Sequence, residues 1–177
     1  MQYRRHKLAG GTYFITIALL NRKSNLLVER AALLREAFAH VMRNHPFKLP
    51  AIVVLPEHLH FIMELPDGDD DFATRIMLIK QYFSRHIPRT EMIKASRARK
   101  GERAIWQRRY WEHCIRDERD YQNHIDYIHI NPVKHKWVTR ASDWAHSSIH
   151  KYIRAGIYPE DWAGGGEAEI ESDEFDG

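Results

Sequence analysis

The chain contains a single cysteine, Cys114, among its 177 residues. One thiol excludes a disulfide within the chain and is typical of proteins from a reducing compartment. No apolar run approaches the roughly 18 residues that a membrane-spanning helix needs. The basic N-terminus is followed by Gly10, Gly11 and Thr12, where a secretory signal would have an apolar region and a cleavage site. We therefore expect a cytoplasmic protein without a membrane segment.

Lysine and arginine are absent from residues 163–177, which hold six acidic side chains and three consecutive glycines. This composition predicts a flexible acidic tail. Residues 1–162 are expected to form one domain, and they carry a formal charge of +9 because the whole chain carries +3. A basic body favours a polyanionic partner. Nucleic acid is favoured over a membrane surface, since no lipid-binding helix stands out.

Apolar periodicity divides the body into alternating strands and helices. The second and third strands are joined by a short connection, which predicts an antiparallel hairpin. The last long helix begins at Asp117, a plausible N-cap, and is expected to end near Asn131 because proline at 132 disfavours helix at the preceding residue. The order β-α-β-β-α-β with later helices predicts an α+β, ferredoxin-like antiparallel sheet with both crossover helices on one face. The expected strands cover residues 12–20, 48–55, 58–65 and 110–115, and the expected helices cover residues 29–44, 72–87, 117–131 and 147–155.

The third strand places His58 and His60 on one face, about 6–7 Å apart at their Cα atoms. The apolar residues between and after them take the opposite face, toward the helices. The two imidazoles then look out from the open face of the sheet, where a later helix would complete a site. They are candidate ligands for one metal ion. A His–apolar–His triplet alone also fits two surface histidines.

The helix that ends near Asn131 supplies further candidates. Tyr127 and Asn131 lie one turn apart on the same side of that helix. Asn131 offers a neutral amide oxygen as a third metal ligand. Tyr127 offers a phenol that can attack phosphorus, provided that a divalent ion assists, because a phenol with a pKa near 10 is a poor nucleophile at neutral pH. His124 is a candidate for contact with phosphate or metal, and Glu64 for a hydrogen bond to a metal ligand.

Acidic side chains are nearly absent from residues 94–109, where Glu102 stands among seven cations. These cations favour contact with phosphates, and a solvated loop is the alternative. The aromatic residues Trp106, Tyr110 and Trp111 lie among them. They either stack on unpaired bases or anchor the fourth strand in the core, and both interpretations stay open. The candidate nucleic-acid ligands are Arg4, Arg5, Lys94, Arg97, Arg99, Lys100, Arg103, Arg108 and Arg109.

Other chemically interesting residues are expected to serve packing or to face solvent. The aspartates of residues 67–71 lack the spacing of a calcium-binding EF-hand, so we expect a solvated loop. Tyr121 competes with Tyr127 as nucleophile, but its neighbour one turn later is Ile125, which cannot bind a metal ion. The remaining residues of this kind are His113, His129 and His135, expected to be structural or exposed, and Cys114, expected to be inert.

Several separated motifs resemble those of one protein family. His58-Leu59-His60 after Leu55-Pro56-Glu57 resembles the His–hydrophobe–His signature of HUH endonucleases. Residues 106–113, 115–118 and 127–135 resemble segments of the REP-associated tyrosine transposases, and residues 10–14 and 147–148 also fit. The resemblance covers roughly residues 3–155. Motifs that recur in the same order are far more specific than the triplet alone.

The resemblance implies a ferredoxin-like HUH domain that nicks and rejoins single-stranded, hairpin-bearing DNA through a 5′-phosphotyrosine intermediate. By motif match, His58 and His60 are metal ligands and Tyr127 is the sole nucleophile. Asn131 stands where the wider family often has Gln, so the amide oxygen lies on a shorter arm. The implied metal is Mg²⁺ or Mn²⁺, although imidazole ligands by themselves favour manganese, zinc or nickel over magnesium.

Two other functions account for parts of the sequence. A non-catalytic nucleic-acid-binding regulator on the same fold needs the basic body but neither a metal ion nor Tyr127. A metal-dependent phosphodiesterase that uses water needs the histidine pair alone. Both a monomer and a homodimer are compatible with the sequence.

Overall fold

The computed structural model describes residues 7–164. The expectations for Arg4, Arg5 and tail residues 165–177 therefore lie outside the described residues. A sheet of four antiparallel strands in the order β2-β3-β1-β4 forms the centre of the molecule. The strands are β1 (Thr12–Ala18), β2 (Ile52–Val54), β3 (His58–Glu64) and β4 (Trp111–Cys114). The helices are α1 (Leu26–Glu29), α2 (Ala31–Asn44), α3 (Phe72–Arg85), α4 (Ala95–Ala98), α5 (Glu118–Lys134), the 3-10 turn η1 (Ala141–Asp143) and α6 (Ile149–Arg154).

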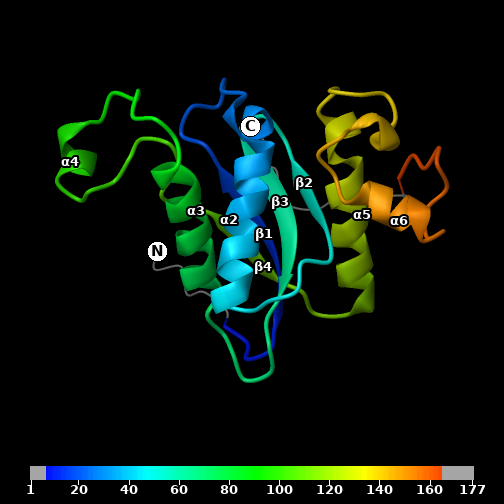
Figure 1. Ribbon diagram of the computed structural model, residues 1–177. Coiled ribbons are helices and arrows are strands. Elements are labelled where there is room, and N and C mark those ends of the chain that lie inside the picture. Colours follow the sequence, from blue (N-terminus) through cyan, green and yellow to red (C-terminus); the bar gives the residue numbers. More distant parts are fainter. Residues whose placement is uncertain (1–6, 165–177) are drawn as a thin grey trace, which may run out of the picture.

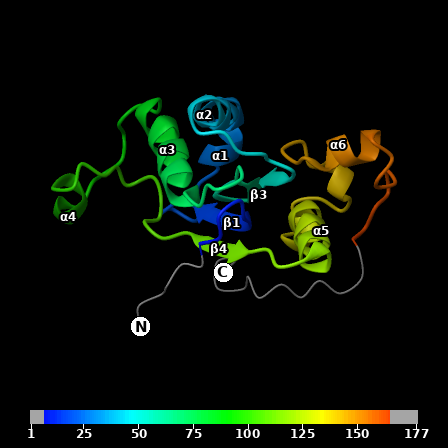
Figure 2. The same ribbon diagram turned by 90° about the horizontal axis from the view of Figure 1, so that it is seen from below.

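The helices are divided between the two faces of the sheet, as Figures 1 and 2 show. Helices α2 and α3 cover one face, and α5 lies across the other with α6 beside it. This arrangement confirms the predicted α+β, ferredoxin-like fold. It follows from the alternation along the central strands, since Leu59, Phe61 and Met63 join the core under α2 and α3, while Ile62 joins the core under α5.

Buried apolar side chains cover both faces of the sheet. Phe14, Ile62 and Ile128 are fully buried between the sheet and α5. Each such side chain contributes about 1.5–3 kcal/mol relative to an exposed one. The apolar core between the sheet and α5 therefore fixes the position of α5 on the sheet. Helix α5 carries Tyr127.

The expected boundaries differ from the structure by one or two residues in most elements, and by three or more residues in two of them. Strand β2 is shorter than residues 48–55, because Pro50 cannot donate a ladder hydrogen bond and Lys48 forms only an isolated bridge to Glu64. Helix α5 does not end at Asn131 but continues through Pro132 to Lys134. Proline in the last turn removes a single helical hydrogen bond. The burial of Asn131 and Pro132 holds this turn in place, and the backbone N–H of His135 still donates to the carbonyl of Asn131, 3.0 Å away.

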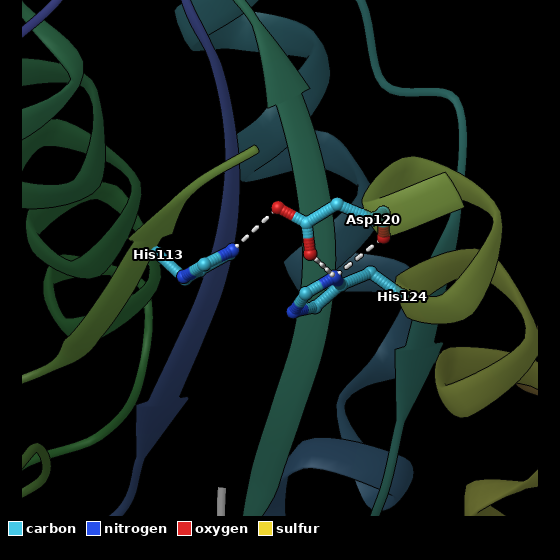
Figure 3. Close-up of side chains that lie close together, drawn as sticks. All are labelled: His113, Asp120 and His124. Carbon is cyan, nitrogen blue, oxygen red and sulfur yellow. Dashed lines mark hydrogen bonds and ion pairs between the residues drawn. The ribbon is translucent and has the colours of Figure 1, made fainter. Parts of the chain in front are cut away.

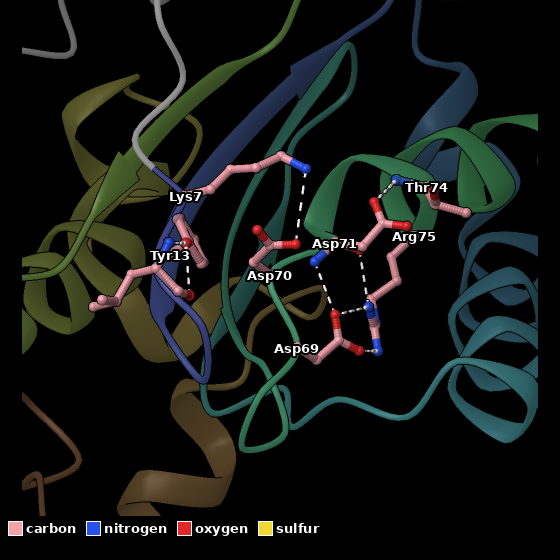
Figure 4. Close-up of polar contacts among 8 residues, drawn as sticks. Lys7, Tyr13, Asp69, Asp70, Asp71, Thr74 and Arg75 are labelled. Carbon is pink, nitrogen blue, oxygen red and sulfur yellow. Dashed lines mark hydrogen bonds and ion pairs between the residues drawn. The ribbon is translucent and has the colours of Figure 1, made fainter.

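The acidic loop before α3 is a structural cap and not merely a solvated loop (Figure 4). The side chain of Asp71 accepts a hydrogen bond from the backbone N–H of Thr74 and caps α3. Asp69 receives two hydrogen bonds from Arg75, of 3.2 and 2.6 Å, and the Arg75 side chain is buried. Asp70 makes a longer, exposed ion pair with Lys7.

Replacing Asp69 by Ala is expected to lower the free energy of unfolding by about 2 kcal/mol, because the buried guanidinium of Arg75 loses its counter-charge. The hydrogen bonds from Arg75 lower the pKa of Asp69. The ion pair therefore contributes stability above about pH 4 and loses it as the pH falls further. Urea unfolding at pH 7 measures the change. Asp70→Ala is the matched control and should cost less than about 0.5 kcal/mol. An equal loss in both variants would contradict this account.

Among the described residues, no helix combines the length and the apolar character needed to cross a lipid bilayer.

Candidate active site

His58 and His60 lie on the face of β3 that α5 covers. Their exposed fractions are 1% and 0%, so they are buried beneath the helix and are not surface histidines. Their ring centroids are 4.9 Å apart. Nδ1 of His60 is 2.7 Å from Oγ1 of Thr16, which is its partner on β1, and Nδ1 of His58 is 2.8 Å from a carboxylate oxygen of Glu57. Each ring is thus held through Nδ1, so Nε2 is the nitrogen available for a metal ion.

Glu57 and Thr16 are site residues that the sequence reasoning missed. Burial raises the pKa of Glu57, but the hydrogen bond with His58 and the charges of His58 and Arg22 outweigh it, so the pKa lies below its ordinary value. Glu57 therefore stays an anion and orients the His58 ring. Two features of the sequence would have pointed to these site residues. Glu57 directly precedes His58, and Thr16 is a polar residue within an otherwise apolar strand interior.

Helix α5 brings Tyr127 and Asn131 over this histidine pair, one turn apart on one side of the helix, and its C-cap residue His135 follows four residues later. The ring of Tyr127 lies 5.4 Å from that of His60, and the ring of His135 lies 5.3 Å from that of His58. Asn131 lies between these two contacts along the helix. The structure therefore brings together all four residues that the sequence singled out, and it adds His135, which had been expected to be structural or exposed.

The second feature of the site is the packing around the ring of Tyr127. Its ring meets the edge of Phe14 at 5.8 Å, and Phe14 also stacks on His60 at 5.5 Å. Nζ of Lys134 lies 4.9 Å from the centre of the Tyr127 ring. Phe14 covers one side of the ring, and Lys134 places a positive charge over the ring face. Lys134 follows Tyr127 by two helical turns, so helical spacing alone would have predicted that the two residues lie on the same side of the helix.

The surroundings of the Asn131 amide show whether these residues fit a divalent ion. Its side chain is 0% exposed, and within residues 7–164 neither its Oδ1 nor its Nδ2 has a hydrogen-bond partner. A buried polar group without a partner costs about 1–3 kcal/mol. An ion bound by Oδ1 would offset that cost. Two imidazole nitrogens and an amide oxygen form a suitable donor set for a divalent metal, so the residues present fit the group.

Replacing Asn131 by Leu is expected to stabilise the metal-free protein by about 1 kcal/mol, because the unsatisfied amide is replaced by an apolar group of similar size. If the amide of Asn131 binds the metal ion, as the resemblance implies, the same change should strongly reduce the DNA cleavage that the resemblance also implies. Thermal unfolding in EDTA and a cleavage assay measure the two effects. Asn131→Gln keeps the amide oxygen and should retain more cleavage than Asn131→Leu. A destabilised Leu variant that cleaves normally would contradict the assigned role.

The other candidates near the site have different partners. Glu64 accepts a hydrogen bond of 3.2 Å from the hydroxyl of Tyr121 and lies 3.9 Å from Lys48, so it is turned toward the end of the sheet. Burial and the negative charge of Glu64 raise the pKa of Tyr121 above its ordinary value, which disfavours it as a nucleophile. His124 belongs to a separate cluster with His113 and Asp120.

Two further expectations from the sequence concern His129 and Cys114. His129 is buried and structural, with Nε2 2.8 Å from the hydroxyl of Ser148, and burial lowers its pKa to about 3. This contact connects α5 with the start of α6. Burial raises the pKa of Cys114, as expected for an inert thiol.

Residues 94–109 form an extension around α4 that projects from the α3 side of the molecule (Figures 1 and 2). Trp106 is a core residue, and its ring N–H donates to the carbonyl of Lys80, 3.2 Å away. Arg103 is used internally, because it pairs with Glu91 and donates to the carbonyls of Ile87 and Pro88. The candidate cations that remain exposed are Lys94, Arg99, Lys100, Arg108 and Arg109.

Comparisons with known proteins agree with this geometry. Residues 9–131 match the family described as "Transposase IS200 like". The chain is 47% identical over 92% of its length to the REP-associated tyrosine transposase of Escherichia coli, covering 91% of that protein. It is 43% identical over 97% of its length to a Haemophilus influenzae protein assigned to the same group, covering 98% of that protein.

A solved structure shows the same fold. It is described as a REP-associated tyrosine transposase bound to a REP hairpin, and it is 45% identical to this chain. The TM-score is 0.82, with 97% of this chain and 95% of that chain covered. These relatives are named tyrosine transposases, which agrees with the tyrosine enzyme that the HUH signature predicts. The chain therefore belongs to the IS200-like transposases and, among them, to the REP-associated tyrosine transposases.

Proposed function

We propose that this chain cleaves and rejoins single-stranded DNA next to a hairpin, with Tyr127 as the nucleophile. The observation that carries the proposal is the placement of the Tyr127 ring 5.4 Å from His60, with Asn131 buried one turn further along α5. His58, His60 and Asn131 would hold the metal ion, which we propose to be Mg²⁺ or Mn²⁺. The REP hairpin bound by the similar structure supports a hairpin substrate. A cytoplasmic location fits a DNA substrate and remains part of the proposal.

The phenol oxygen of Tyr127 attacks the phosphorus of a phosphodiester and forms a 5′-phosphotyrosine. The leaving 3′ oxygen takes up a proton and becomes a free hydroxyl. Because the covalent bond keeps the energy of the phosphodiester, a 3′ hydroxyl can attack it in reverse and rejoin the DNA without ATP. A bound divalent ion supplies polarisation of the phosphate and offsets the negative charge of the transition state. The positive charge of Lys134 near the Tyr127 ring favours the ionised form of the phenol.

The burial of Tyr127 has a consequence for this reaction. Only 2% of the residue is exposed, so a DNA strand reaches the phenol after neighbouring groups move. The rings of Phe14 and His60 contact the ring of Tyr127 and are the groups nearest to it that would have to move.

The basic extension is the proposed phosphate-binding surface. An open hollow of about 630 Å³ lies between α3 and this extension. Six cations and the single acid Glu102 line it. The cations are Lys80, Arg85, Arg89, Arg97, Arg103 and Arg108. Arg103 is paired with Glu91, and the remaining cations make this concave surface mainly positive. Such a surface suits the backbone of a DNA stem, and contacts with it position the substrate without reading its sequence.

The double replacement Arg85→Ala and Arg89→Ala, which removes two exposed cations of this hollow, is expected to weaken hairpin binding about tenfold at low salt and to reduce the salt slope of binding by about 1–2. Each side chain is exposed, so the fold should be unaffected. Fluorescence anisotropy with a labelled hairpin at several salt concentrations measures both effects. Arg154→Ala on α6 is the control for an exposed cation away from the extension and should change neither value. Equal effects of the two replacements would contradict the proposed surface.

Denaturing electrophoresis tests the proposed reaction. The protein is incubated with labelled single-stranded hairpin DNA and Mg²⁺ before denaturation. A covalent protein–DNA band is expected. Cleavage without that band would instead indicate a phosphodiesterase that uses water. Binding in a native gel without any cleavage would indicate a regulator on the same fold.

A further inference from the structure

Figure 3 shows a second group of potential metal ligands, formed by His113, Asp120 and His124. His113 comes from β4, and Asp120 and His124 come from the first turns of α5. One ligand atom from each residue lies within 4.8 Å of the others. Nε2 of His113 is 2.8 Å from one carboxylate oxygen of Asp120, and Nδ1 of His124 is 3.1 Å from the other. Two nitrogens and a carboxylate thus converge from two elements.

The sheet register explains why His113 faces the helix. His113 is the direct partner of Phe14 across the β1–β4 pair, and Phe14 belongs to the core beneath α5. His124 packs on the same Phe14 ring at 4.7 Å. The rings of His113 and His124 are stacked at 4.7 Å with an angle of 15° between their planes, so they present their edges in a common direction. The cluster is therefore built by the packing of α5 on the sheet edge.

The carboxylate of Asp120 is held in place by contacts outside the cluster. The backbone N–H of Arg116 donates to it at 2.9 Å. The backbone N–H of Asp120 itself donates to the N-cap residue Asp117 at 2.8 Å. Burial raises the pKa of Asp120, but the hydrogen bonds from His113 and Arg116 outweigh it, so the group is an anion at neutral pH. Asp120 and His124 are both buried. A fixed, buried anion between two imidazoles is a preformed donor set.

The same contacts also describe a purely hydrogen-bonded network, in which each imidazole donates to the carboxylate. Burial lowers the pKa of His124, the hydrogen bond to the carbonyl of Asp120 raises it in part, and the net shift is downward. A neutral ring is the form that binds a metal. A bound ion would take the place of the protons on Nε2 of His113 and Nδ1 of His124, the two nitrogens that face Asp120. Each ring would remain neutral and carry its one proton on the other nitrogen. His124 would then lose its 2.7 Å hydrogen bond to the carbonyl of Asp120.

We propose that His113, Asp120 and His124 bind a second divalent transition-metal ion of the zinc class, which connects β4 to the start of α5. Two imidazoles and one carboxylate are a ligand set that suits zinc, with water as the fourth ligand. This ion is distinct from the ion of the histidine pair, because the Phe14 ring contacts both His60 and His124 and stands between the two clusters.

The position of the second site gives the ion a structural role. It would fix the first turns of α5 to the edge strand, while Tyr127 and Asn131 lie further along the same helix. The ion would therefore hold the near end of the helix when the surroundings of Tyr127 move to admit DNA. It would not contact the DNA or the reacting phosphate.

Zinc content tests the proposal with the full chain, without a histidine tag. The double variant His58→Ala and His60→Ala removes the first proposed site. This variant is treated with a chelator, incubated with zinc, desalted and then analysed for bound metal. We expect about one zinc per chain. Adding His113→Gln, or separately Asp120→Asn, should reduce the bound zinc at least tenfold. Adding His40→Ala, an exposed histidine on α2, should leave it unchanged.

Each outcome of this experiment is decisive. Circular dichroism confirms that the variants fold, and zinc should raise the melting temperature of the double variant but not of the variant with His113→Gln. The proposal is overturned if the folded double variant holds less than a tenth of an equivalent of zinc. It is also overturned if His113→Gln and Asp120→Asn leave the bound zinc unchanged, which would mean a hydrogen-bonded network only. Neither readout depends on DNA cleavage, so a failure here is separate from a failure of the proposed nucleophile.

Discussion

Replacing Tyr127 by Phe is expected to reduce DNA nicking by about 10³-fold or more and to eliminate the covalent protein–DNA band, because no other group at this position can form the phosphotyrosine. The ring contacts with Phe14, His60 and Lys134 do not involve the hydroxyl and are kept. Stability and hairpin affinity should therefore change little. Denaturing electrophoresis measures nicking and the adduct, and anisotropy measures binding.

Tyr121→Phe is the matched control for this prediction. It makes the same chemical change on the same helix, but Tyr121 donates to Glu64 and its pKa is raised. The control should lose about 1 kcal/mol of stability with its hydrogen bond and retain nicking. Undiminished adduct in the Tyr127 variant, or loss of adduct in the Tyr121 variant alone, would move the nucleophile to the other tyrosine.

Replacing His60 by Ala is expected to abolish metal-dependent nicking, with a loss of about 10³-fold or more that excess Mg²⁺ or Mn²⁺ rescues only weakly. The ring is fully buried between Thr16, Phe14 and Tyr127, so its loss removes a metal ligand and part of the wall around the phenol. Nicking as a function of metal concentration measures the effect. If EDTA leaves nicking by the unmodified protein untouched, the metal role is wrong.

A milder variant separates the loss of a ligand from damage to the site. Thr16→Val keeps the shape of the residue and removes only its hydrogen bond to Nδ1 of His60. The metal affinity should fall by about 10–100-fold, and added metal should restore nicking. His40→Ala, on the far side of the sheet, should leave metal dependence unchanged. A Thr16→Val protein with normal metal affinity would show that this contact does not orient His60.

The sequence predicted the fold correctly, and it indicated which side chains would come together around His58 and His60, because both depend on local patterns. Alternating apolar residues in residues 58–65 assigned Leu59, Phe61 and Met63 to one core and His58 and His60 to the other face. The spacing of Tyr127 and Asn131 placed them on one side of a helix. The errors came from features that local patterns do not contain. Proline in the last turn of α5 suggested a helix end, but burial of that turn against the sheet overrode the local preference.

The partners of the site residues could not be predicted, since they come from distant parts of the chain. Thr16 meets His60 only because β1 and β3 pair in one register. Arg103 looked like a phosphate ligand in a run of cations, yet the fold turns it inward to Glu91 and to backbone carbonyls. Trp106 had two open interpretations, and the packing against α3 selected the core.

The amino-acid order alone determined which side chains share a face, because strand and helix periods of 2 and 3.6 residues follow from backbone geometry. It thereby determined the layered fold and the candidates for nucleophile and metal ligands. The tertiary structure decided how those faces meet. Only the packing of α5 on the sheet brought Tyr127 over His60, buried Asn131 without a partner among the described residues, and assembled His113, Asp120 and His124 into one cluster. Distances between separate elements depend on side-chain packing across the whole core, which no local pattern encodes.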